Sequence, residues 1–229
     1  MKLLTILLCL FCYQFSFAKE HLPQSKTFIG KNKFHEITSQ AVKEQWHKLT
    51  IGERMVNIAL HLKGVPYKGH TLEIDNYVES PSVNFKGLDC WTFFETTLCM
   101  ARMLESKKQH YQPSDLLKEV ELTRYRAGVC NGNYLDRIHY LMEWYQENEA
   151  RGIVNNLTKK FPHQAMPNKC DEMTRLWKYY RYLKYNPKLR KGMAYHEQRL
   201  TKMNFHRIQK DKVKAIEKHL RNGDIIGIA

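Results

Sequence analysis

The sequence predicts one α+β domain behind an export signal, and three observations lead to this. Apolar residues recur at helical spacing through much of the region between residues 35 and 101. Short strand-like stretches stand at residues 71–74 and again from Ile225 onward, after a turn at Asn222 and Gly223. No repeat, low-complexity tract or second hydrophobic span follows Ala18, so one domain is the economical interpretation.

Residues 1–18 have the pattern of a secretory signal peptide. One positive charge at Lys2 precedes an apolar stretch over residues 3–17, and small residues stand at both ends of "SFA". A membrane anchor would need about 20 apolar residues, whereas this stretch is shorter and contains Gln14. We therefore expect cleavage after Ala18 and a secreted or periplasmic protein.

The mature chain then keeps four cysteines: Cys90, Cys99, Cys130 and Cys170. An even number of cysteines in an exported chain suggests disulfides. Cys90 and Cys99 would lie about 13 Å apart along one helix, while bridged Cα atoms lie within about 7 Å. These two cannot pair, and whether Cys130 and Cys170 are bridged stays open.

Charge is the next constraint. Lysine and arginine number 37 against 23 acidic residues, giving +14, or +13 without the signal. The partner should be anionic, which for an exported protein indicates cell-wall polymer, muropeptide carboxylates or an acidic membrane surface. No pattern of a nucleic-acid module is visible, and the sequence indicates no metal and no cofactor. Basic residues are spread over residues 178–218, where a plain solvated face is an equally good interpretation.

Two stretches before residue 64 predict helices, "HEITSQAVKEQWHKL" (35–49) and "IGERMVNIALHL" (51–62). In the second, four residues make one stripe: Met55, Ile58, Ala59 and Leu62. Gly64 would end that helix. Residues 19–34 are polar and are interpreted as a loose leader, so that the folded domain would span residues 35–229.

The stretch "GLDCWTFFETTLCMARML" predicts a buried helix that starts at a cysteine. Asp89 is placed as the N-cap of this helix, and Cys90 would lie in its first turn. The positive end of the helix dipole favours a thiolate there, and unpaired N–H groups could receive an oxyanion. The alternative is a small buried packing residue. A cysteine nucleophile also needs a base, and the sequence brings none of the 11 histidines to Cys90.

"GERMVNIALHLKGVPYKGHTLE" followed by "GLDCWTFFETTLCMARML" resembles the N-acetylmuramoyl-L-alanine amidase-like family, also called domain of unknown function 1460, of the NlpC clan. "TRYRAGVCNGNYLDRIHYLMEWYQEN", "GIVNNLT", "HEQRL" and "LRNGDIIGIA" fit the same family. The resemblance covers about residues 51–229. It implies a papain-like α+β fold, with the cysteine helix packed on an antiparallel sheet, and amide hydrolysis in peptidoglycan. It also implies Cys90 as the nucleophile, and Tyr67 as a hydrogen-bond donor to the oxyanion or substrate.

"YLDRIHYLMEW" (134–144) predicts a helix with a core stripe of Leu135, Ile138, Met142 and Tyr145. Four neighbouring residues are candidates for binding a muropeptide: Arg137, His139, Tyr140 and Trp144. An arginine guanidinium can bind a carboxylate through two hydrogen bonds, and aromatic rings provide flat surfaces against which a sugar can pack. The alternative gives Arg137 a local acid and makes His139 a packing residue. In the family's insertion, residues 107–221 here, "RLWKYYRYLKY" predicts a helix whose aromatic stripe packs against the sheet.

The resemblance also bears on the end of the chain. In the family, the strand that begins near Ile225 leads to a further strand carrying the catalytic histidine. We therefore expect a truncated sequence in which the catalytic histidine is not present and hydrolysis is very slow; the alternative base is His139 or His206. The leading hypothesis is an exported cysteine amidase. The alternatives are a stem-peptide endopeptidase of the same clan and a non-catalytic basic wall-binding protein.

Overall fold

The computed structural model describes residues 21–228, so the predicted signal peptide lies outside the described residues. The helices are α1 Gln24–Thr27, α2 Lys31–Lys43, α3 Ile51–His61, α4 Cys90–Met103, α5 Pro113–Arg124, α6 Leu141–Ala150, α7 Glu172–Arg175, α8 Arg181–Tyr185, α9 Pro187–Thr201 and α10 Val213–Ile216. The strands are β1 Phe28–Ile29, β2 Val83–Asn84, β3 Gln164–Met166 and β4 Phe205–Arg207. Single 3-10 turns occur between several of them.

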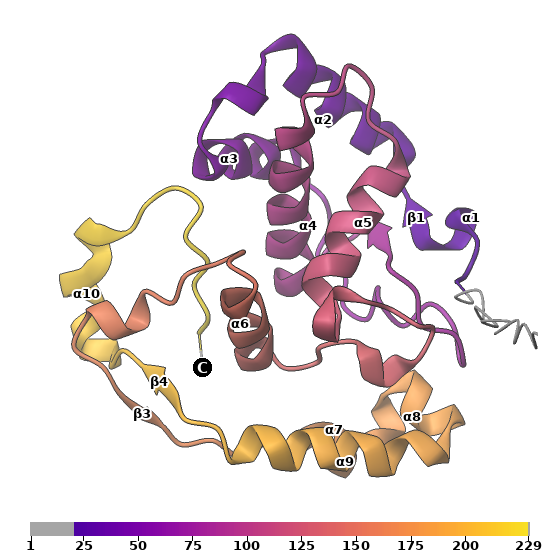
Figure 1. Cartoon of the computed structure of the whole chain (residues 1–229), viewed down its shortest axis with the longest axis vertical. Helices are drawn as coiled ribbons and strands as arrows, with labels where there is room; N and C mark the ends of the chain where they lie inside the picture. Colours follow the sequence, from indigo (N-terminus) through magenta and orange to yellow (C-terminus); the bar gives the residue numbers. More distant parts are fainter. Residues whose placement is uncertain (1–20, 229) are drawn as a thin grey trace, which may run out of the picture.

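Helix α4 is the centre of the larger part of the molecule, residues 21–157, which we call the body (Figure 1). It packs against α3 and α5. Apolar side chains of α2 to α6 are almost fully buried in one core: Phe34, Ile37, Ile58, Met100, Leu116 and Trp144. The cysteine helix is thus held on several sides by the main hydrophobic core, whose burial stabilises the fold.

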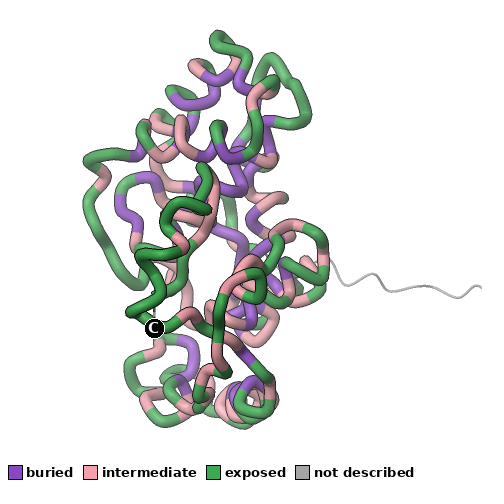
Figure 2. Tube along the Cα trace, turned by 90° about the vertical axis from the view of Figure 1, so that its left-hand side faces the viewer, coloured by how far each residue is buried: buried purple, intermediate pink, exposed green. Residues whose placement is uncertain are grey.

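Residues 158–221 form the C-terminal lobe, which follows the bottom and left side of the view in Figure 1. A second, smaller core joins the lobe to the body through Tyr134, Met173, Tyr182, Leu183 and Met193. Strands β3 and β4 pair antiparallel, with Ala165 opposite His206. Figure 2 shows buried segments in both parts, with long exposed stretches between them.

The α+β class is confirmed, but helices dominate and the sheets are small. β1 pairs with β2 in parallel, and β3 pairs with β4. The antiparallel sheet that the resemblance places against the cysteine helix is not formed by residues 21–228. Helix α4 packs against α3 and α5 instead.

Two predictions about the first 80 residues need correction. The described part of the expected loose leader packs on the body, because Phe28 is 3% exposed and its strand pairs with β2. Residues 71–74, expected as a strand, form a loop. Arginine side chains occupy its carbonyl groups: Arg137 donates to the Leu72 carbonyl oxygen at 3.1 Å, and Arg181 donates to that of Glu73 at 3.0 Å.

The predicted helix over residues 134–144 is also only partly right. A 3-10 turn at residues 134–136 is followed by extended backbone, and α6 begins at Leu141. Arg126 holds this extended stretch, since its guanidinium donates to the carbonyl oxygens of Leu135 and Arg137. "RLWKYYRYLKY" is likewise broken, into α7, a 3-10 turn and α8, and it packs in the second core rather than on a sheet.

The last described residues return to the body. Gly223 lies against Gly52 at the start of α3, where a Cβ on Gly52 would come within 2.0 Å of the Asn222 carbonyl oxygen. Ile225 packs on the main core, while Ile226 and Ile228 are 63% and 95% exposed. The expected buried strand is therefore a segment without regular secondary structure that turns one apolar residue inward. Within residues 21–228, no helix is both long and apolar enough to cross a membrane.

Candidate active site

The start of α4 is fixed by a reciprocal cap. The Asp89 carboxylate accepts a hydrogen bond from the Thr92 amide at 2.8 Å, and the Thr92 hydroxyl accepts one from the Asp89 amide at 2.9 Å. Such a capping box satisfies two end groups of a helix and defines its first residue. The prediction that Asp89 caps a helix beginning at Cys90 is confirmed.

Cys90 combines an exposed thiol with unused backbone donors. Its side chain is exposed. The amides of Cys90 and Trp91 have no acceptor among residues 21–228, because the cap uses only the Thr92 amide in this turn and the Phe93 amide bonds the Asp89 carbonyl oxygen. The indole N–H of Trp91 is buried and also lacks a partner there. A carbonyl approaching this thiol would meet donors that can bind an oxyanion.

The segment containing Tyr67 lies beside the approach to this helix. The Lys68 amide donates to the Leu88 carbonyl oxygen at 3.0 Å, and the Leu88 amide donates to that of Pro66 at 3.2 Å. These two bonds form a parallel bridge between Tyr67 and Leu88, two residues before Cys90. The Tyr67 side chain is 77% exposed. The bridge brings the Tyr67 backbone next to Leu88, and the role of the Tyr67 hydroxyl at the cysteine stays a prediction.

A buried ion pair anchors the cysteine helix. Glu95, one turn after Cys90, binds Arg124 of α5 at 2.6 Å, and both side chains are at most 1% exposed. Arg124 also donates to the Ser82 carbonyl oxygen at 2.7 Å, and the Trp144 indole donates to Glu95 at 3.1 Å. One carboxylate therefore ties α4 to α5, α6 and the strand region around β2. This pair was not predicted from the sequence, because Glu95 and Arg124 are 29 residues apart and nothing in the sequence indicates that they meet.

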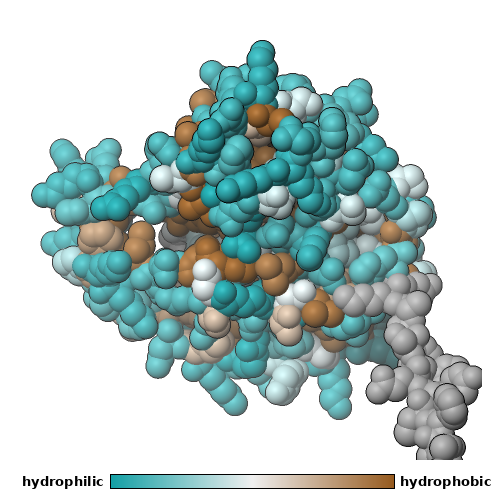
Figure 3. All heavy atoms as spheres, turned by 45° about the horizontal axis from the view of Figure 1, so that its top comes forward, coloured by the Kyte–Doolittle hydropathy of each residue, from teal (hydrophilic) through white to brown (hydrophobic). Residues whose placement is uncertain are grey.

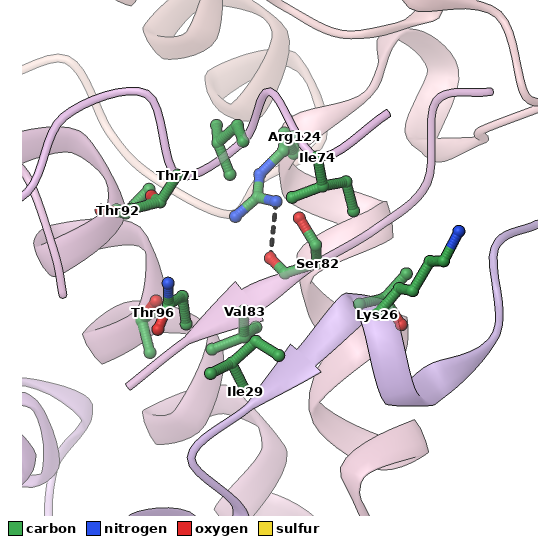
Figure 4. Close-up of a pocket in the computed structure, with 12 residues that line it drawn as sticks. Lys26, Ile29, Thr71, Ile74, Ser82, Val83, Thr92, Thr96 and Arg124 are labelled. Carbon is green, nitrogen blue, oxygen red and sulfur yellow. Dashed lines mark hydrogen bonds between the residues drawn. The ribbon is translucent and has the colours of Figure 1, made fainter. Parts of the chain in front are cut away.

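A small cavity lined by both polar and apolar side chains lies behind the first two turns of α4 (Figure 4). Its volume is about 30 Å³, and Thr71, Thr92, Thr96, Ser82 and Arg124 are among its lining residues. The Thr71 hydroxyl is buried without a partner among the described residues. This volume suits one water molecule, so a muropeptide would have to reach Cys90 from its exposed side.

The other three thiols differ from Cys90. Burial raises the pKa of Cys130 to about 12 and raises that of Cys99 further. Burial also raises the pKa of Cys170. All four cysteines are free, so the bridge between Cys130 and Cys170 that the sequence left open is not formed.

We expect iodoacetamide at neutral pH to alkylate Cys90 first in the folded chain. The reagent reacts with thiolates, and the other thiols are buried or hold raised pKa values. Peptide mapping after a short labelling pulse measures the order, with a pulse in denaturant as the control in which all four should react alike. Faster labelling of Cys99 or Cys170 in the folded protein would contradict the assignment.

None of the 11 histidines, all within residues 21–228, forms a hydrogen bond with the Cys90 thiol. His139 is half-buried, its ring nitrogen bonds the Tyr134 carbonyl oxygen at 3.0 Å, and loss of solvent around the ring holds its pKa well below the usual value. His206 lies in β4 against His163, with ring centres 4.9 Å apart. His70 is exposed in the segment after Tyr67 and has a left-handed φ of 60°. The sequence analysis did not single out His70.

The four candidate substrate-binding residues have partners within the protein. Arg137 is buried, pairs with Glu73 at 2.6 Å and lies over the Tyr134 ring. His139 packs on the same ring. The half-buried Tyr140 donates its hydroxyl to Glu197 at 2.5 Å, and Trp144 is fully buried. These positions match the structural alternative, and their binding of substrate stays a prediction.

Comparison with known proteins places the chain in a family. The family model described as AmiA-like, N-acetylmuramoyl-L-alanine amidase-like, matches residues 57–229. The chain belongs to this N-acetylmuramoyl-L-alanine amidase-like family. The match includes the cap, Cys90 and the whole C-terminal lobe. No curated protein matches the chain.

Solved structures agree with membership of the amidase-like family. A putative xylanase from Bacteroides fragilis is 29% identical with a TM-score of 0.59, over 67% of this chain and 65% of that one. An N-acetylmuramoyl-L-alanine amidase from Bacteroides uniformis ATCC 8492 is 25% identical with a TM-score of 0.63, over 70% and 67%. A second structure with the same amidase description is 24% identical with a TM-score of 0.66, over 76% of this chain and 71% of that one. At this identity the likeness shows the fold alone. The chain thus spans about two thirds of the length of these neighbours.

Proposed function

We propose that this amidase-like protein hydrolyses the amide between N-acetylmuramic acid and L-alanine with Cys90 as the nucleophile. The observation that carries the proposal is the exposed thiol at a capped helix start with two unused amides beside it. The family and the amidases among the structural neighbours support a hydrolase of amide bonds in the cell wall.

The proposed reaction is acyl transfer in two steps. The Cys90 sulfur attacks the muramoyl carbonyl carbon, and the amides of Cys90 and Trp91 stabilise the oxyanion. The C–N bond then breaks, the base passes the proton taken from the Cys90 thiol to the leaving L-alanine nitrogen, and a thioester remains. Water attacks the thioester, releases N-acetylmuramic acid and restores the thiol. In this proposal the Tyr67 hydroxyl donates to the substrate or oxyanion.

The general base is proposed to lie outside these 229 residues. This rests on the positions of the described histidines, since the ring of His139 is bonded to the Tyr134 carbonyl oxygen and His206 lies in β4 of the C-terminal lobe. A cysteine nucleophile without its base hydrolyses amides slowly, because nothing delivers a proton to the leaving amine. His70 is the competing candidate within the chain, because it is exposed and follows Tyr67, whose backbone pairs with Leu88, by three residues.

Glycoside hydrolysis, which the description of one neighbour suggests, has weaker support here. It requires a pair of carboxyl groups facing the sugar. Near the start of α4, the Asp89 carboxylate caps the helix and Glu95 is buried on Arg124. These two acids are therefore engaged.

The proposed reaction takes place after export, and anionic cell-wall polymer is a second partner. The support for export is the charged and apolar pattern of residues 1–18. Sequencing the N-terminus of protein recovered from the periplasm or medium tests it: Lys19 at the first position agrees with cleavage after Ala18, and an intact Met1 contradicts it.

Mass spectrometry of digested muropeptides tests the bond that is cut. Free stem peptide together with N-acetylmuramic acid supports the amidase. Shortened stems would assign an endopeptidase of the same clan. Material that binds but keeps its mass, even with a base added as free imidazole, would assign a binding protein.

A further inference from the structure

The net charge of the protein is concentrated in one part of the molecule. The C-terminal lobe, residues 158–221, contains 18 lysines and arginines but only five acids, a net charge of +13. Residues 21–157 contain 17 basic and 16 acidic residues. The body is therefore close to neutral, and the lobe carries nearly the whole charge of the chain.

Folding makes the lobe surface still more basic. Of the five acids, Glu197 is 2% exposed and accepts hydrogen bonds from the Met173 and Thr174 amides. Two others form surface pairs, Asp171 with Lys169 and Asp211 with Lys212. Thirteen exposed cations of the lobe have no carboxylate partner among the described residues: Lys159, Lys160, Lys178, Arg181, Lys184, Lys188, Lys191, Lys202, Arg207, Lys210, Lys214, Lys218 and Arg221.

Helix α9 arranges part of this charge in a row. Its outward stripe, spaced by three and four residues and continuing one residue past the helix end, is Lys188, Lys191, Tyr195, Gln198 and Lys202, all exposed. A helix of 15 residues is about 22 Å long. Lys188 stands in the first turn, where no acid is present and where the helix dipole disfavours a cation. A lysine at this position lowers the stability of the helix. Such a cost is expected where the charge serves to bind a ligand.

We propose that the C-terminal lobe binds a linear polyanion along the outer stripe of α9 and the cations that follow β4. The basic surface extends from α9 through β4 to the 3-10 turns around α10, which matches a chain of repeated negative groups better than one small anion. Gln198 and the 67% exposed Tyr195 add a hydrogen-bond donor and a flat ring between the charges. This site is separate from Cys90 and goes beyond the proposed hydrolysis.

A polymer fits this surface better than a lipid membrane does. The exposed large apolar residues of the lobe are three tyrosines, one valine and one leucine: Tyr179, Tyr185, Tyr195, Val213 and Leu220. An interfacial helix needs a broad apolar face beside its basic one, and α10 has only four residues. Figure 3 shows mainly hydrophilic atoms over the projecting arm at the left of the view.

The test measures binding of long-chain inorganic polyphosphate to the full chain across a salt series. The triple variant Lys188→Gln, Lys191→Gln, Lys202→Gln removes three charges from the stripe. Its matched control, Lys43→Gln, Lys48→Gln, Lys63→Gln, removes three exposed charges from the body. Counterion release predicts that losing three contacts weakens binding at least about tenfold at low salt and lowers the salt slope by about 2. The control should change the affinity by less than about threefold.

Three results would overturn the proposal: equal weakening by both triples, no polyphosphate binding, or binding to phosphatidylglycerol vesicles without binding to polyphosphate. Circular dichroism confirms that each triple is folded, since glutamine keeps a good helix propensity. The variant Cys90→Ala should bind polyphosphate like the parent chain. The result is therefore independent of whether Cys90 hydrolyses anything.

Discussion

Replacing Cys90 by alanine is expected to abolish amide hydrolysis of a muropeptide, including the activity restored by free imidazole. Free imidazole can act as the base for the parent chain, but in the variant it has no nucleophile to activate. Loss of a covalent nucleophile costs about 10³-fold or more in rate. Release of free stem peptide, followed by mass spectrometry, measures both proteins with and without imidazole.

The matched control is Cys170→Ala, which removes a thiol with a raised pKa and should leave the rate unchanged. Two outcomes would contradict the account. Hydrolysis by Cys90→Ala at the parent rate would exclude Cys90 as the nucleophile. Full parent activity without imidazole, lost on His70→Ala, His139→Ala or His206→Ala, would instead place the base within the chain.

The second large effect concerns stability. Replacing Glu95 by alanine leaves the Arg124 guanidinium buried without its carboxylate, and the Trp144 indole loses its acceptor. Breaking a buried pair by removing one partner costs about 3–5 kcal/mol in the free energy of unfolding. α4, α5 and α6 meet at this carboxylate. Glu95→Ala should therefore both lower the free energy of unfolding and displace the start of α4, where Cys90 lies. Urea unfolding followed by tryptophan fluorescence measures the change.

The control for this prediction is Glu36→Ala. Glu36 pairs with Lys33 at 2.7 Å, but its side chain is 51% exposed. An exposed pair contributes about 0–1 kcal/mol. A loss of stability no larger in Glu95→Ala than in Glu36→Ala would mean that the buried pair does not hold the cysteine helix.

Features set by neighbouring residues could be predicted from the sequence. The cap on α4 depends on Asp89 and Thr92, which are three residues apart. The apolar stripe of α3 depends on residues three or four positions apart along one helix. Both were predicted correctly. The family was also predicted, because its motifs near Cys90 lie within short stretches of chain.

Features that depend on distant partners could not be predicted. From the sequence, the Arg137 guanidinium is a candidate to bind a substrate carboxylate. In the structure it already binds the carboxylate of Glu73, 64 residues earlier. The stretch 71–74 has strand-like residues, but arginines from later segments bind its carbonyls. The total charge was visible in the composition, whereas its concentration on one lobe required knowing where the chain divides between two cores.

The central claim is that the Cys90 sulfur accepts the muramoyl acyl group, and an activated substrate tests it most directly. The p-nitrophenyl ester of the N-acetylmuramic acid carboxyl group needs no proton on its leaving group, so acylation should proceed even without a general acid. The account predicts that the acid-quenched chain gains the mass of one N-acetylmuramoyl group, in a thioester on the peptide that contains Cys90. A label on another residue, or equal labelling of the Cys90→Ala variant, would contradict it.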